Sequence, residues 1–157
     1  MKITLLQIDE TDDTWVKDGS DKFAKRISRY LKLETKTIKI NKSIRQKSID
    51  EQKLFEAKSI LNHLLKDDFL ILLDENGKSF NSIEFSTYLD DLKLNQRKNL
   101  VFLIGGPYGF SEEIYQRSNF QLSLSKMTFS HQMIRVFFLE QLYRACTISR
   151  GEKYHHE

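Results

Sequence analysis

Two continuous apolar runs, DFLILLD at residues 68–74 and NLVFLIG at residues 99–105, constrain the fold of this chain more than any other feature. Each run has the length of a β-strand, and neither alternates between polar and apolar side chains. A strand of this kind needs cover on both faces, which a parallel sheet between two layers of helices provides. The two runs therefore predict a buried sheet at the centre of an α/β fold.

The rest of the chain alternates between strand-like and helix-like segments, without an internal repeat or a low-complexity linker. Further strands are expected at residues 2–8, 35–40 and 120–125, the second of them at an edge because TKTIKI alternates. Helices are expected at residues 13–31, 49–65 and 130–148, and from the capping residues Ser82 and Ser111, with a basic loop at 41–48. This order predicts one domain over residues 1–157, with a mainly parallel sheet and helices on both faces.

Periodicity also predicts which side chains the helices bury. In the helix expected at residues 49–65, the spacing places Leu54, Ala57, Leu61, Leu64 and Leu65 on one face. This face is therefore expected to pack against the sheet.

Composition limits the environments that suit the chain. Of its 157 residues 39 % are apolar, and a net charge of +3 is too mild to identify a nucleic-acid or membrane binder. The single cysteine, Cys146, has no partner for an intrachain disulfide, which fits a reducing compartment. No apolar segment is long enough for a signal peptide or a membrane span, so a cytoplasmic protein is expected. His63 and His131 have no partners at ligand spacing, so no metal site is expected.

Three of the six glycines occur in LIGGPYGF at residues 103–110, directly after the second apolar run. Ligands of open α/β sheets bind beyond the carboxyl ends of the strands, and glycine lets backbone approach a ligand closely. The segment is either a binding loop or a tight turn between a strand and a helix. Its spacing matches neither a dinucleotide-binding loop nor a phosphate-binding loop.

Two other segments end predicted strands with polar and small residues, LLDENGK at residues 72–78 and SLSKMTFSH at residues 123–131. If the three strands lie side by side, their ends line one crevice. An apolar lining would then suit a flat heterocycle, and backbone N–H and C=O groups would hold its edge. The residues expected to form that lining are Leu73, Leu124, Met127 and Phe129.

The helix expected near the end of the chain is apolar around most of its circumference. Either a second copy of the chain covers its outer side, which gives a homodimer, or the helix is wholly internal. Arg135 and Arg144 interrupt the apolar surface, and they either reach solvent or Glu140, or point at a phosphate or a reacting group. Cys146 is expected to pack as a small core residue.

LIGGPYGF, QLSLSKMTFSHQMIRVFFLEQLYRACTI and the ending RGEKYHHE together resemble the RlmH family of SPOUT methyltransferases, and the resemblance covers essentially the whole chain. It implies a SPOUT fold with a trefoil knot in the C-terminal part, and a homodimer. It also implies S-adenosyl-L-methionine as the methyl donor. The implied target is the N3 atom of a pseudouridine in the helix 69 loop of 23S ribosomal RNA, on the assembled ribosome.

The same resemblance assigns roles to individual residues. Those implied to bind the methyl donor are Leu73, Gly105, Leu124, Ser125, Lys126, Met127, Thr128 and Phe129. For catalysis, His155 is the candidate base because the pKa of histidine suits proton removal near neutrality. Tyr154 would stack on or orient the flipped base, and Arg144 would stabilise negative charge on the imide oxygens or hold a phosphate.

The chain departs from the usual pattern of the family at three positions. Asp9 stands where many relatives have glycine, Ser130 where proline is usual, and His156 where lysine or arginine is common. None of these positions is assigned to chemistry.

Two other functions fit the same sequence: methylation of another RNA such as tRNA, and a non-catalytic role as a ribosome-assembly factor that binds RNA. A nucleotide hydrolase is disfavoured because the chain has no phosphate-loop motif. In each RNA-binding case the expected contacts come from Lys42, Arg45, Lys47, Arg150 and Lys153.

Overall fold

The computed structural model describes residues 1–95 and 99–154, which form an α/β fold with one parallel sheet. The strands are β1 (Lys2–Ile8), β2 (Lys32–Ile38), β3 (Phe69–Ser79), β4 (Asn99–Ile104) and β5 (Phe120–Ser123). The helices are α1 (Thr14–Ile27), α2 (Lys42–Arg45), α3 (Ile49–His63), α4 (Ser82–Leu94), α5 (Glu112–Arg117) and α6 (Met133–Ser149).

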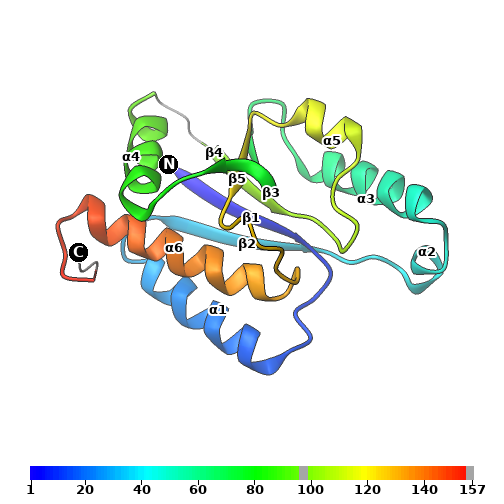
Figure 1. The fold of residues 1–157 in the computed structure, drawn as a ribbon, viewed down its shortest axis with the longest axis horizontal. Coiled ribbons are helices and arrows are strands. Elements are labelled where there is room, and N and C mark those ends of the chain that lie inside the picture. Colours follow the sequence, from blue (N-terminus) through cyan, green and yellow to red (C-terminus); the bar gives the residue numbers. More distant parts are fainter. Residues whose placement is uncertain (96–98, 155–157) are drawn as a thin grey trace.

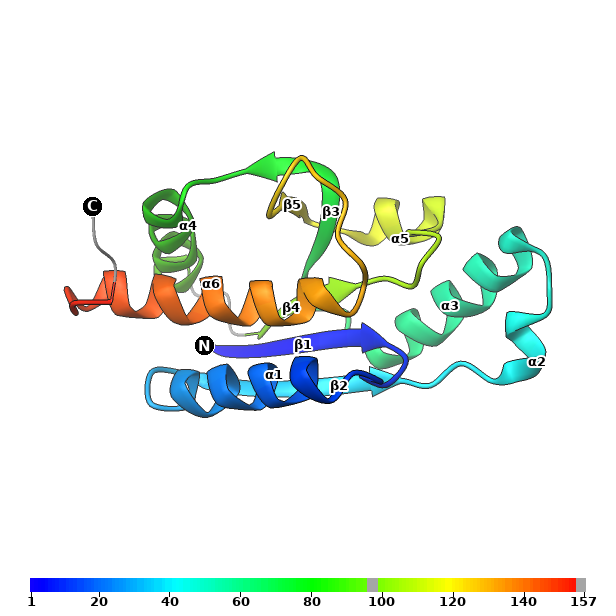
Figure 2. The same cartoon turned by 60° about the horizontal axis from the view of Figure 1, so that its bottom comes forward.

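The strands are arranged in the order β2-β1-β4-β3-β5, and every neighbouring pair is parallel. Helices α1, α4 and α6 pack on one face of the sheet, and α3 and α5 pack on the other (Figure 1 and Figure 2). The predicted α/β architecture with helices on both faces is confirmed. Within the described residues, no helix is long and apolar enough to cross a membrane.

The two apolar runs are β3 and β4, each of which lies between two other strands. In β4, Leu100, Phe102 and Ile104 face the layer that contains α6. Val101 and Leu103 face the layer that contains α3. All five side chains are at most 4 % exposed, and burial on both faces explains why the sequence does not alternate.

Three local predictions were wrong. The basic segment at 41–48 is not wholly a loop, because it contains α2. Helix α4 is capped by Asn81 rather than by Ser82: the Asn81 side chain accepts a hydrogen bond from the Glu84 N–H, and the Glu84 carboxylate accepts one from the Asn81 N–H, both at 2.8 Å. The edge strand β2 begins at residue 32 instead of 35, and a Lys2–Glu34 ion pair of 2.6 Å links it to β1.

The first apolar run was expected to end at residue 74, but β3 continues to Ser79. Its pairing with β5 is interrupted after Leu73 and resumes at Lys78. A Cβ at Gly77 would lie 2.6 Å from the carbonyl carbon of Gln121. The glycine therefore lets β3 return to the sheet after the irregular residues 74–77.

Arg135, in the first turn of α6, is 1 % exposed, so it does not reach solvent. Its guanidinium donates to the carbonyls of Ile8 (2.7 Å) and Asp9 (3.1 Å) and to the Thr11 hydroxyl (2.7 Å). These bonds satisfy carbonyls at and just after the end of β1 and fasten the start of α6 there. Further along α6, burial raises the pKa of the half-buried Cys146 to about 11, which keeps it a neutral thiol.

Truncating Leu142 tests whether α6 forms the core on its side of the sheet. Leu142 is fully buried, so Leu142→Ala should lower the free energy of unfolding by about 2–5 kcal/mol. Leu54→Ala is the matched control, because Leu54 is 65 % exposed and its truncation should cost less than about 1 kcal/mol. Urea unfolding measures both, and equal losses would contradict the assigned core.

Candidate functional site

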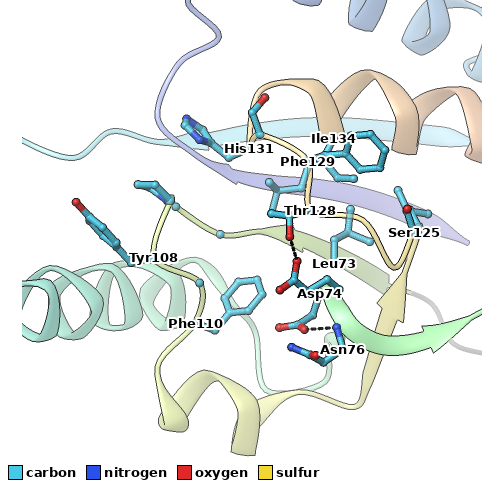
Figure 3. Close-up of a pocket in the computed structure, with 18 of the residues that line it drawn as sticks. Leu73, Asp74, Asn76, Tyr108, Phe110, Ser125, Thr128, Phe129, His131 and Ile134 are labelled. Atoms are coloured by element: carbon cyan, nitrogen blue, oxygen red, sulfur yellow. Dashed lines mark hydrogen bonds between the residues drawn. The ribbon is translucent and has the colours of Figure 1, made fainter.

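A cavity of about 620 Å³ opens where β4 and β5 end and where β3 becomes irregular after Leu73 (Figure 3). Strand β3 lies between β4 and β5 in the sheet, so the segments that follow β4 and β5 meet the irregular part of β3 at one edge, in the single crevice that the sequence predicts. The lining comes from residues 73–76, from 104–110 and from most of 122–131, together with Tyr115 and Ile134. A cavity of this volume suits a small organic ligand.

The turn after β4 brings its backbone close to the cavity. The Gly109 N–H donates to the Gly106 carbonyl at 3.2 Å, and Gly109 has a φ of 72°, which favours glycine. A Cβ at Gly105 would lie 2.9 Å from Cε1 of Phe110, and one at Gly106 would lie 2.7 Å from Oε1 of Glu56. The segment is therefore a tight turn whose glycines leave room for the side chains packed against it.

Glu56 of α3 is a buried carboxylate beside this turn, 5 % exposed. It accepts a hydrogen bond from the Gly106 backbone, and its Oε1 lies 2.9 Å from Nη1 of Arg45. Arg45 also pairs with Asp9. Burial raises the pKa of Glu56, and the Arg45 guanidinium opposes that shift. The network connects α2 and α3 to the end of β1 and to the turn after β4.

Sequence reasoning missed Glu56 because the spacing in α3 favoured leucines on the buried face. Leu54 and Leu65 are instead 65 % and 66 % exposed, whereas Gln52 and Glu56 are buried. The Gln52 amide donates to the carbonyl of Arg45 at 3.2 Å, so this face of α3 binds α2 through polar groups. A pattern of apolar residues gives no signal for such an arrangement.

Asp9 occupies a position where the backbone is left-handed, with a φ of 60°. Its carboxylate accepts a hydrogen bond from the Ile40 N–H at 2.9 Å and pairs with Arg45. These contacts offset the cost of about 1–2 kcal/mol that a residue other than glycine pays for this conformation. The structure thereby accommodates aspartate in a backbone conformation that favours glycine.

Residues 74–77, the irregular part of β3, contact α5 and the segment that follows β5. Asp74 accepts hydrogen bonds from the Asn76 N–H at 2.8 Å and from the Tyr115 hydroxyl, and Glu75 accepts one from the Thr128 hydroxyl. Burial and the Asp74 carboxylate raise the pKa of Tyr115, so the phenol keeps its proton and remains a donor. Contacts from α5 and from the segment after β5 thus hold both carboxylates at the cavity.

His131 lies at the border of the cavity, just before α6 (Figure 3). Burial and the nearby Arg135 lower its pKa, so the ring is neutral at pH 7. Among the described residues that line the cavity, none is a lysine or an arginine. The cavity therefore lacks the cations that commonly hold phosphate groups.

Most of the residues predicted to bind a methyl donor line the cavity: Leu73, Gly105, Leu124, Ser125, Met127, Thr128 and Phe129. Lys126 is exposed and does not line it. The lining also includes Asp74, Glu75 and Tyr115, which the sequence did not single out. The first two lie within the quoted LLDENGK segment, but nothing in the sequence pattern indicated Tyr115.

The structure brings Arg144 and Tyr154 together, but away from the cavity: Ile134 lines the cavity, and Arg144 lies 10 residues further along α6, which is about 15 Å along the helix axis. Arg144 pairs with Glu140 at 2.5 Å, and its guanidinium carbon lies 4.7 Å from the centroid of the Tyr154 ring. The Tyr154 hydroxyl donates to Glu140 at 3.2 Å, and burial and this carboxylate raise its pKa. The 17 residues of α6 span about 25 Å. His155 and His156 lie outside the described residues.

Of the five cations expected to contact RNA, the two arginines contact other side chains of the protein, and the three lysines are exposed. Arg45 is engaged by two carboxylates, and the Arg150 guanidinium carbon lies 4.8 Å from the centroid of the Tyr30 ring. Lys42, Lys47 and Lys153 are exposed. In the part of the chain that the structure describes, no group of histidine, cysteine or acidic side chains is arranged to hold a metal ion.

Comparison with known families defines the class of the protein. A family model described as "Predicted SPOUT methyltransferase" matches residues 1–155, so the chain belongs to the SPOUT methyltransferase family. It is 50 % identical over 156 residues to ribosomal RNA large subunit methyltransferase H of Cytophaga hutchinsonii, which covers 99 % of this chain and 100 % of that protein. Proteins of the same name from Parabacteroides distasonis and Flavobacterium johnsoniae are 46 % and 48 % identical over 100 % of both chains. The resemblance inferred from the sequence is confirmed.

Replacing Arg45 with methionine tests the network beside the turn. Without the guanidinium, the pKa of Glu56 rises further above its ordinary value. The folded state then binds a proton that the unfolded chain has released, so the free energy of unfolding should fall as the pH rises through this pKa. Urea unfolding from acidic to neutral pH measures the slope, which should be steeper than in the wild type.

The double variant Arg45→Met/Glu56→Gln is the control for this experiment. It has no carboxyl group at position 56 to titrate, so the additional slope should disappear. Identical pH dependence of the single and double variants would show that Glu56 is not the responsible group.

Proposed function

We propose that the chain methylates N3 of a pseudouridine in the helix 69 loop of 23S ribosomal RNA. S-adenosyl-L-methionine is the proposed methyl donor, and the assembled ribosome in the cytoplasm is the proposed site of action. Relatives named as ribosomal RNA large subunit methyltransferases match this chain from end to end, which supports the proposal. The observation that carries it is the cavity, whose lining contains most of the residues that the family resemblance assigns to the donor.

The cavity fits S-adenosyl-L-methionine in size and chemistry. The adenosyl group is a flat heterocycle on a sugar, and the apolar side chains of Leu73, Leu124 and Phe129 line the same space as the Gly105 backbone. The volume of about 620 Å³ lies within the range of sites for ligands of this size. The lining residues that the structure describes include no lysine or arginine, which suits a donor that carries no phosphate. The trefoil knot implied by the family is part of this proposal, and the turns around the cavity would form it.

The bound donor would supply its methyl carbon to N3, with the carbon–sulfur electron pair staying on sulfur and the N3 proton leaving. The chain's task is to hold both reactants in line and to exclude water. His155 is proposed to take the proton, and Arg144 to stabilise negative charge on the imide oxygens. Tyr154, kept protonated beside Glu140, is proposed to orient the base.

A single copy of the chain does not bring Arg144 and Tyr154 to the cavity, because the cavity borders the first turn of α6 and Arg144 lies in the second half of this helix. We propose a homodimer in which α6 of each copy packs antiparallel to its partner, so that the tail of one copy reaches the cavity of the other. Exposed apolar side chains near the start of α6 support such a contact: Phe137 is 42 % exposed and Met127 is 74 % exposed.

Mass spectrometry of ribosomal RNA from cells with and without this chain tests the proposed reaction. The methyl group on the helix 69 pseudouridine should be absent without the chain, and the purified protein should restore it on ribosomes. Free RNA should be a poorer substrate, because a net charge of +3 is modest for holding RNA without a folded surface to recognise. Methylation of tRNA instead would support a tRNA methyltransferase. Failure to bind the donor in calorimetry would support a non-catalytic assembly factor.

Mixing two inactive variants tests the composite site. Gly105→Leu would push a side chain against Phe110 in the cavity, and Tyr154→Ala removes the aromatic ring from the tail. In a mixed dimer one of the two sites combines an intact cavity with an intact tail, so an equal mixture should recover about a quarter of wild-type activity. Each variant alone is the control. Inactive mixtures that nevertheless contain mixed dimers would rule out this arrangement.

A further inference from the structure

The charge of the cavity lining is unbalanced. Asp74 lines it from the irregular part of β3 (Figure 3), and the next residue, Glu75, is also part of the lining. No lysine or arginine is among its described lining residues, and burial beside Arg135 keeps His131 neutral. The lining therefore presents negative charge without a compensating cation.

The two carboxylates are held in place by neutral groups. Asp74 accepts hydrogen bonds from the Tyr115 hydroxyl and the Asn76 N–H, and Glu75 accepts one from the Thr128 hydroxyl. Neither carboxylate takes part in an ion pair within the described chain. Hydrogen bonds of this kind fix the position of a carboxylate and leave its charge in place.

We propose that Asp74 and Glu75 make the cavity selective for the cationic methyl donor over the neutral thioether that remains after methyl transfer. The inference rests on the proposed function. S-adenosylmethionine has a sulfonium group and a net positive charge, whereas S-adenosylhomocysteine has a thioether and no net charge. The two molecules differ by one methyl group, so an apolar lining distinguishes them weakly, while a negative field distinguishes them by charge.

This selectivity follows the course of the reaction. The methyl carbon bonds to N3, the electron pair of the carbon–sulfur bond stays on sulfur, and the N3 proton leaves. The sulfur is then uncharged, and the attraction that Asp74 and Glu75 exert on the sulfonium is lost. The product is released more readily than the donor, and the cavity is prepared for the next donor molecule.

Calorimetry with S-adenosylmethionine, S-adenosylhomocysteine and sinefungin tests the inference on the wild type and on Glu75→Gln and Asp74→Asn. Each substitution should weaken S-adenosylmethionine binding by about threefold to tenfold and should change S-adenosylhomocysteine binding less than about twofold. Sinefungin carries a protonated amine close to the position of the sulfonium, so it should behave like the donor. Glu75→Gln retains an acceptor for Thr128, and urea unfolding verifies that both variants fold.

Asp91→Asn is the matched control, because it makes the same charge change on an exposed part of α4, a helix with no residue in the lining of the cavity. It should change neither affinity. If the wild type binds neither nucleoside, the proposed function fails. If the wild type binds both and the two variants weaken both equally, or weaken neither, the charge selectivity is wrong and the proposed function stands.

Salt dependence gives a second readout. Donor binding should weaken with ionic strength more in the wild type than in Glu75→Gln, because salt screens the attraction between the carboxylate and the sulfonium. Equal salt dependence in the two proteins would contradict the proposal.

Discussion

Burial of β3 and β4 on both faces is the constraint on which the rest of the structure depends. Strands covered by helices on both sides carry few polar side chains, so their chemistry is confined to the segments that follow them. All strands of the sheet are parallel, which places those segments at one edge, and the order β4-β3-β5 makes them neighbours. The cavity is therefore a direct consequence of how the core is built.

A glycine-rich turn has few side chains of its own to hold it, and its support comes from distant parts of the chain. Glu56 reaches Gly106 from α3, and Arg45 connects this carboxylate to Asp9 at the end of β1. Buried ion pairs of this kind add little net stability, but removing one partner leaves an unpaired charge behind. The network therefore fixes the geometry of the turn more than it stabilises the fold.

The predictions that succeeded rest on local, strongly patterned sequence. The apolar runs gave the sheet, and the parallel direction of its strands placed Leu73, Gly105 and Leu124 at one edge. The buried Glu56 and the short helix α2 could not be predicted, because both depend on contacts between residues far apart in the chain. The donor-binding assignments came from family resemblance, since periodicity carries no information on residues such as Ser125.

Helix α6 keeps apart the two parts of the proposed site, which are the cavity and the group that contains Arg144 and Tyr154. Arg135 fastens its first turn to the end of β1 beside the cavity, while Glu140, Arg144 and Tyr154 form one group that extends from the middle of the helix toward its end. A continuous helix of about 25 Å does not bend to bring its own ends together. The described residues that line the cavity all lie in one copy of the chain. In the proposed dimer, methyl transfer also needs the tail of the second copy, so the proposed reaction depends on association of the chains.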